Sequence, residues 1–439
     1  MTQEYQQIYQ QQGKLLLDAF KELNIYLNGY RSLKDSANST EDKLNLFRLA
    51  YCAWFYAMEN CIILREHIRA SDTTIEMERL YSIRRMLVSI YEMSKHLFGV
   101  EEKLEKRSLW SVTKPILQRT DAQECAIIDG EIKVFKDGFV NFDTKNSRCL
   151  FEHYAEIPKD LEMEMKRLTA EVGDVHMRRF LNIICKIAKL AAKCIGNDME
   201  LAQYVDTSIE VDNEPEMQPS DSLTNLQRFL IMQSDKQVGY NLVFDLFYKK
   251  VDNICIVASG QPSNAARLLK DFNDLHFLCT QIQRDISYAM LSITASESRV
   301  EQLMNVRYVF RHVHEGYKQI YGYTQDRQES KSYWARCIKP YICGIADEHI
   351  IKQYHEIETL LKKYSEEDVN DEGKRAVLTH IRVRPKKQDD YIQDLMDWCQ
   401  STTLISELGV LTNFQKTITK VSDFTNVFRK EVLKTIRSF

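Results

Sequence analysis

The chain has 439 residues, of which 44% are hydrophobic and 28% charged, and only 14 are Gly and 7 are Pro. This composition is typical of a helical globular protein and unlike that of a sheet-rich or disordered one. The formal net charge of −4 excludes a globally basic protein that coats nucleic acid.

No apolar run approaches the roughly 20 residues that a membrane span requires. The N-terminus is polar and Gln-rich and lacks the layout of a signal peptide. We therefore expect a cytoplasmic protein with no membrane contact.

Amphipathic patterns with intervals of three and four predict an all-α chain. In the first part of the chain we expect five helices, at roughly 3–30, 41–71, 74–99, 159–172 and 174–196. Gly99 stands where a C-cap would close the third of them. Residues 126–143 are the exception, because apolar and polar residues alternate there around Asp129-Gly130 and Asp137-Gly138. That alternation predicts a small β-meander.

Residues 206–222 concentrate acids and two prolines, which is typical of a linker. This predicts a first helical domain over 1–205, an acidic linker over 206–222 and a second helical domain over 223–439. In the second domain we expect helices at roughly 223–252, 263–294, 297–322, 347–366, 387–400 and 402–437.

The two domains repeat one another in sequence. At an offset of 223, the segment 80–99 aligns with 303–322, and Leu80, Arg84, Glu92, Lys95 and Gly99 meet Leu303, Arg307, Glu315, Lys318 and Gly322. Trp110 meets Trp334 at 224, Ala70-Ser71 meets Ala295-Ser296 at 225, and Arg148 and His153 meet Arg375 and His380 at 227. Offsets confined to 223–227 favour duplication. We interpret the repeated tryptophans as core anchors and Glu92 with Lys95 as an ordinary solvated ion pair.

The doubled pairs Arg148-x4-His153 and Arg375-x4-His380 resemble the R-x(4–6)-H signature of HEPN-type ribonucleases. The resemblance covers about a dozen residues in each half; Cys149 and Ala376 stand where the family often has a polar residue. It implies helical domains acting in pairs, a composite site and metal-independent cleavage of RNA, of the kind found in toxin and phage-defence systems. In that chemistry a histidine moves the proton of a ribose hydroxyl and an arginine holds the phosphate.

Basic residues that follow the two pairs are candidates for phosphate binding. They are Lys159, Arg382, Arg384, Lys386 and Lys387. A solvated face is the favoured explanation of these residues, and structural roles are the favoured explanation of the duplicated Arg/His pairs. Arg307 and His312 also form R-x4-H, but Ser89 replaces the histidine in the first half, so we interpret this third match as chance.

The eleven cysteines include no C-x-x-C pair, and the chain has no Gly-rich phosphate loop, no H-E-x-x-H and no G-x-S-x-G. We expect neither metal nor cofactor. Two hypotheses remain: a non-catalytic binding or regulatory protein that engages another macromolecule, and a HEPN-like endoribonuclease with a composite site. The partner would be a protein or RNA, and the sequence leaves the oligomeric state open.

Overall fold

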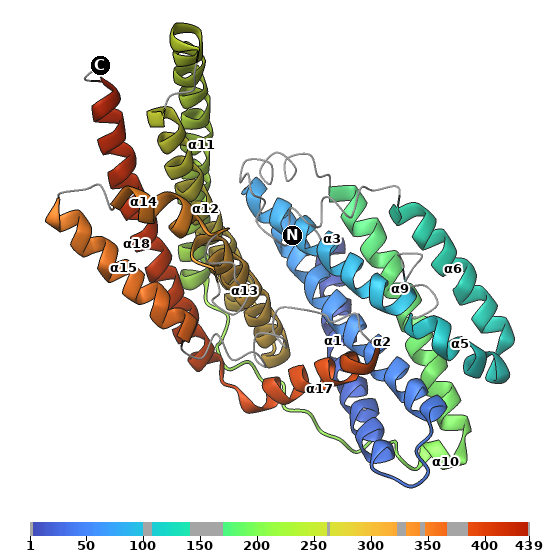
Figure 1. Cartoon of the computed structure of the whole chain (residues 1–439). Coiled ribbons are helices and arrows are strands. Elements are labelled where there is room, and N and C mark those ends of the chain that lie inside the picture. Colours follow the sequence, from blue (N-terminus) through green and yellow to red (C-terminus); the bar gives the residue numbers. More distant parts are fainter. Residues whose placement is uncertain are drawn as a thin grey trace.

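The computed structural model describes residues 3–99, 108–140, 170–260, 264–322, 331–342, 347–366 and 385–437. Within these ranges the fold consists of 14 α-helices and one π-helical turn, without a strand (Figure 1). The all-α prediction is therefore confirmed for the described part of the chain. No helix there is both long and apolar enough to cross a membrane.

One set of helices surrounds α2. Its members are α1 (Gln3–Lys34), α2 (Glu41–Ser71), α3 (Glu76–Phe98), α5 (Leu109–Thr120), α6 (Ala122–Val140), α9 (Ala170–Asn197) and the one-turn α10 (Met199–Ala202). Helix α2 packs against α1, α3, α5 and α9. Its sequence from Leu46 to Leu64 is apolar almost all round, as expected of a helix buried on every side.

A second set surrounds α12. Its members are α11 (Asp221–Ser259), α12 (Asn264–Thr294), α13 (Arg299–Ile320), the π-helical turn η3 (Trp334–Ile338), α14 (Lys339–Ile342), α15 (Glu348–Glu366), α17 (Pro385–Ser401) and α18 (Leu404–Arg437). Helix α12 packs against α11, α13 and α18 and also touches α3 of the first set.

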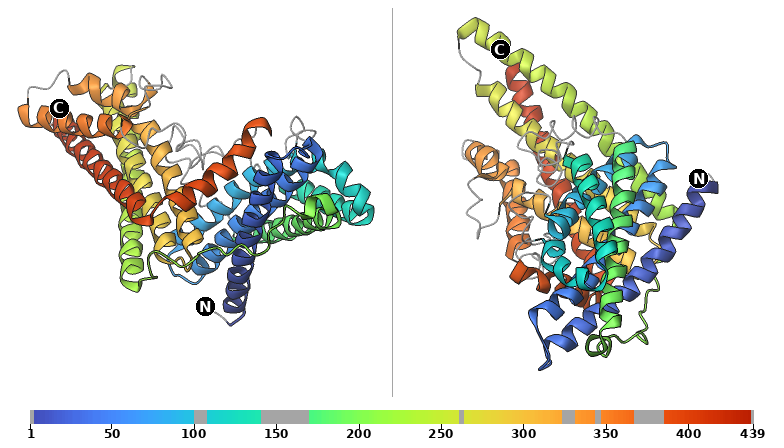
Figure 2. Two further views of the ribbon diagram at one scale, coloured as in Figure 1. Left: turned by 90° about the horizontal axis from the view of Figure 1, so that it is seen from below. Right: turned by 90° about the vertical axis from the view of Figure 1, so that its right-hand side faces the viewer.

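The two sets lie side by side, and Figure 2 shows the angle between them. Helix α17 crosses from the second set to the first, where Asp397 pairs with Arg31 of α1 at 2.7 Å. A single cluster of buried apolar side chains runs from Leu16 of α1 to Phe428 of α18. Apolar packing is therefore continuous across both sets.

The prediction of a β-meander is wrong where the structure describes it, because residues 122–140 form helix α6; residues 141–143 lie outside the described ranges. Cys125, Ile128, Ile132 and Phe135 are buried at helical intervals of three and four. Helix α9 packs on α6. Burial of this face against α9 outweighs the two Asp-Gly pairs, which by themselves favour turns.

Capping residues explain several helix ends. Thr40, Ser220 and Ser298 accept hydrogen bonds from backbone N–H groups three residues onward, at the starts of α2, α11 and α13. Gly99 and Gly322 adopt positive φ angles of 62° and 82° after α3 and α13. This confirms the C-cap predicted at Gly99, and Gly322 follows α13 with the same positive φ.

Candidate functional site

The predicted catalytic residues Arg148, His153, Arg375 and His380 lie outside the described residues, as do Lys159, Arg382 and Arg384. Lys386 and Lys387 fall in the first turn of α17. The Arg/His pairs therefore stay a prediction.

A buried group of charges joins α3 of the first set to α12 and α13 of the second. Arg84 donates a hydrogen bond to Oδ2 of Asp285 at 2.8 Å, and Nδ1 of His312 lies 3.3 Å from the same oxygen. The side chains of Arg84 and Asp285 are 1% and 0% exposed. Burial lowers the pKa of His312 to about 3, although the Asp285 carboxylate acts in the opposite direction. His312 is therefore neutral at physiological pH.

A second buried ion pair joins an arginine of the second set to an acid of the first set. Arg307 of α13 donates to Oε1 of Glu59 on α2 at 3.0 Å, and its guanidinium carbon lies 5.5 Å from the ring centre of Tyr391 on α17. Arg84 and Arg307, which align in the sequence repeat, thus each reach an acid of the other set.

Further polar contacts tie the same surfaces together. Arg85 pairs with Glu66 and donates to Oδ1 of Asn305 at 2.7 Å. Arg284 donates to the hydroxyl of Tyr81 at 2.7 Å. All five side chains are buried.

This junction corrects one sequence interpretation. Arg307 and His312 are both buried at the contact between the two sets, and the interpretation of their R-x4-H spacing as a chance match stays a prediction. Glu92 is buried as well, contrary to the predicted solvated pair with Lys95. The hydrogen bonds and ion pairs of this buried group join α2 and α3 of the first set to α12 and α13 of the second.

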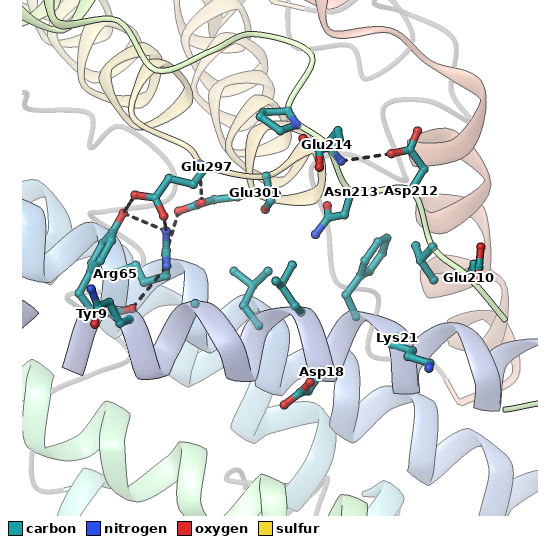
Figure 3. Close-up of a pocket in the computed structure, with 18 of the residues that line it drawn as sticks. Tyr9, Asp18, Lys21, Arg65, Glu210, Asp212, Asn213, Glu214, Glu297 and Glu301 are labelled. Carbon is teal, nitrogen blue, oxygen red and sulfur yellow. Dashed lines mark hydrogen bonds and ion pairs between the residues drawn. The ribbon is translucent and has the colours of Figure 1, made fainter. Parts of the chain in front are cut away.

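An open groove of about 1230 Å³ lies elsewhere, between α1 and the non-helical segment 209–215 (Figure 3). The start of α13 and Arg65 of α2 close one end. Apolar side chains from both walls line it, namely Leu16, Leu17, Phe20, Ile209 and Val211.

Ion pairs fix the closed end of the groove. Arg65 donates to Oε2 of Glu297 at 2.6 Å and lies 3.5 Å from Oε1 of Glu301, while Arg69 reaches the same Glu301 oxygen at 3.2 Å. The hydroxyl of Tyr9 donates to Glu297 at 3.1 Å. Partial burial alone raises the pKa of Glu297, but the hydrogen bond and charge of Arg65 lower it overall. The carboxylate of Glu297 is therefore held ionised beside Arg65.

The wall formed by 209–215 is fastened to α13. The carbonyl oxygen of Asn213 accepts from N of Arg299 at 3.0 Å, and its side chain accepts from N of Val300 at 2.9 Å. Next along the chain, Glu216 pairs with Arg299 at 2.8 Å. These bonds hold the non-helical wall of the groove against the start of α13.

The rim of the groove is acidic. Glu210, Asp212 and Glu214 are exposed, and within the described residues they form no ion pair. Figure 3 shows Asp212 and Glu214 across the opening from α1. Lys21 is the exposed cation among the lining residues. The unneutralised rim therefore favours a positively charged occupant.

Sequence reasoning missed the groove. Its walls come from segments about 200 residues apart, and the acids of 206–222 were interpreted only as linker composition. In the described residues, no group of three or more His, Cys, Asp or Glu is placed to hold a metal ion.

Comparison with known proteins adds no relative. No family model, no curated protein and no solved structure matches the chain.

Proposed function

We propose that this chain is a non-catalytic binding protein, and that its groove receives a basic amphipathic segment of a protein partner. The observation that carries the proposal is the open groove of about 1230 Å³ with an apolar lining and an acidic rim. Leu17 is 48% exposed there and offers apolar contact, while Glu210, Asp212 and Glu214 meet cationic side chains of the partner.

The chain in this proposal is a tandem duplication, with units 1–205 and 223–439 joined by 206–222. The order of packing supports it: α2 packs against α1, α3 and α9, as α12 packs against α11, α13 and α18. The cross-set pairs support it too. The repeat offset of 225 takes Asn60 to Asp285, so the acids Glu59 and Asp285 that receive Arg307 and Arg84 stand one position apart in the repeat.

Peptide binding tests the groove. A fluorescein-labelled amphipathic peptide of Leu and Lys should bind wild type, and the same peptide with Glu in place of Lys should not. Glu210→Lys/Glu214→Lys should weaken binding of the Leu/Lys peptide by roughly tenfold or more, because the rim charge reverses. Fluorescence anisotropy at two salt concentrations measures this, with weaker binding at higher salt.

The matched control is Glu348→Lys/Glu356→Lys, which makes the same change in net charge at exposed positions of α15. It should bind the peptide as wild type does. Equal binding of both peptides, or equal loss in the control, would show that only the overall charge acts.

A second function, a HEPN-like endoribonuclease with a composite site, keeps one specific support. The pairs Arg148/His153 and Arg375/His380 fall in 141–169 and 367–384, which follow α6 and α15 respectively. Each of these helices comes after one of the two aligned tryptophan segments, α5 and η3. The pairs thus stand at matching points in the order of elements. Lys159, Arg382, Arg384, Lys386 and Lys387 would bind phosphates in this proposal.

Cleavage of a mixed RNA pool in EDTA tests it. Under this proposal wild type cleaves without metal and His153→Ala/His380→Ala does not, because the proton transfer is lost. The control is His349→Ala/His355→Ala, which removes two exposed histidines of α15 and should leave cleavage unchanged. Intact RNA after incubation with folded wild type would rule the nuclease out for the isolated protein.

A further inference from the structure

Helix α11 exposes an unusually apolar face. Nine large apolar side chains on it are 45–87% exposed and form what we name the α11 stripe: Leu226, Phe229, Met232, Tyr240, Val243, Leu246, Phe247, Ile254 and Val257. In Figure 1 the C-terminal part of α11 projects beside α12 and the end of α18. The other face of α11, with Ile231, Val238, Asn241 and Tyr248, is buried where α11 packs on α12.

The stripe has the spacing of a coiled-coil seam. Positions 226, 229, 233, 236, 240, 243, 247, 250, 254 and 257 follow one another at alternating intervals of three and four. Seven of the ten are apolar, and Gln233, Lys236 and Lys250 fill the rest. This repeat of 3.5 residues is the pattern by which one helix packs along another.

The exposed area is large enough for a stable interface. From the fractional exposures, the nine side chains present roughly 900 Å² to solvent. The largest apolar patch on a typical monomer is about 300–600 Å², and a standard interface buries about 800 Å² on each partner. From Leu226 to Val257 the stripe runs about 46 Å at 1.5 Å per residue.

The spacing of the seam positions is the same in either direction along the helix. About the midpoint between Asn241 and Leu242, position 226 exchanges with 257, 229 with 254, and 240 with 243, and all six residues are apolar. A twofold contact between identical surfaces needs this self-complementarity.

The charges select the direction of pairing. In a parallel pair Lys236 would face Lys236 and Lys250 would face Lys250 across the seam, which sets like charges together. In the antiparallel pair Lys236 lies opposite Phe247, and Lys250 lies opposite Gln233. The lysine stems then cover apolar surface while the ammonium groups reach water.

We infer that the α11 stripe pairs antiparallel with the same stripe of a second copy of this chain, forming a homodimer. This surface is separate from the groove, so the inference holds or fails independently of the proposed function. Leu226 packs on the second copy's Val257, Phe229 on its Ile254, and Tyr240 on its Val243. The central layer occurs twice next to the twofold axis, so it contributes most.

Light scattering after gel filtration tests the dimer. Wild type should show twice the 51.6 kDa mass of the chain. Tyr240→Glu/Val243→Glu should run as a monomer, with a dimer dissociation constant raised roughly a hundredfold, because four carboxylates would meet at the axis. The control is Met199→Glu, which places a charge on an apolar residue that is 92% exposed on α10, and it should remain dimeric.

The antiparallel direction of the helix pair is tested by replacing one exposed side chain, which leaves the buried core unchanged. A benzoyl-phenylalanine photo-crosslinker in place of Phe229 should join the second copy near Ile254, as mapped by mass spectrometry. A crosslink to the region of Phe229 itself would overturn the antiparallel arrangement. Wild type that is monomeric, or a dimer that survives Tyr240→Glu/Val243→Glu, would overturn the stripe as the interface, and a crosslink to another protein would assign it to a different partner.

Discussion

Asp285 shows what a single carboxylate does at the junction of the two helix sets. It accepts from Arg84 of α3 and lies beside His312 of α13, with no exposed surface of its own. A buried ion pair contributes little net stability relative to a well-packed apolar pair, but breaking it leaves an uncompensated charge. The junction therefore depends on both partners being present.

Arg84→Met should lower the free energy of unfolding by about 3–5 kcal/mol, because Asp285 stays buried without its cation. Arg84→Met/Asp285→Asn should recover at least half of that loss. Urea unfolding followed by circular dichroism measures both variants.

The comparison variant is Arg31→Met, which breaks the more exposed Arg31–Asp397 pair. It should cost less than about 1 kcal/mol. If Arg84→Met costs no more than Arg31→Met, Asp285 has another source of compensation and the junction does not rest on this pair.

At the scale of elements, α1 and α11 differ in what lies against the faces that align in sequence. With the repeat offset of 223, Gln6, Leu17 and Phe20 of α1 correspond to Phe229, Tyr240 and Val243 of α11. The α1 residues line the groove, with segment 209–215 across from them. In α11 the corresponding residues are exposed and larger or more apolar at two of the three positions. Under the proposed duplication, the same helix face is a groove wall in α1 and is open to solvent in α11.

Close packing of α1 on α2 rests on a missing side chain. A Cβ added to Gly29 would lie 2.5 Å from a ring carbon of Phe47 and 2.8 Å from the backbone oxygen of Tyr204. Gly29→Ala should therefore destabilise the protein by about 1–3 kcal/mol, because a backbone atom has to move. Gly409→Ala in α18 meets nothing within 4 Å and should stabilise it by up to about 1 kcal/mol.

Both alanine variants are compared by their urea midpoints, with the slope of each transition as a check that the unfolded states are alike. Stabilisation by Gly29→Ala would mean that α1 and α2 are not packed as closely as the structure has them.

Across the whole molecule, local pattern predicted the long helices well. The ranges expected for 41–71, 74–99 and 347–366 differ from α2, α3 and α15 by at most two residues at either end. The pattern failed at α6, where Asp129-Gly130 and Asp137-Gly138 carried a local signal for turns. Only contact with α9, made far along the chain, decides that segment.

The candidate sites were harder to predict, for a physical reason. Arg84 and Asp285 are 201 residues apart, and nothing in the neighbourhood of either residue indicates its partner. The available signal was that Arg84 and Arg307 align in sequence, each on the apolar face of a helix, since a buried arginine needs a buried acid. The groove offered even less, because its walls come from α1 and from an apparent linker.

The position of segment 209–215 has a thermodynamic consequence. It is the covalent connection between the two sets, it is bonded to the start of α13, and it forms one wall of a groove whose other wall is α1. An occupant therefore binds only while these parts are together, and its binding free energy adds to the work of separating them. At a free concentration one hundred times its dissociation constant, such an occupant adds about 2.7 kcal/mol. Binding in the groove and contact between segment 209–215 and α1 are therefore thermodynamically linked.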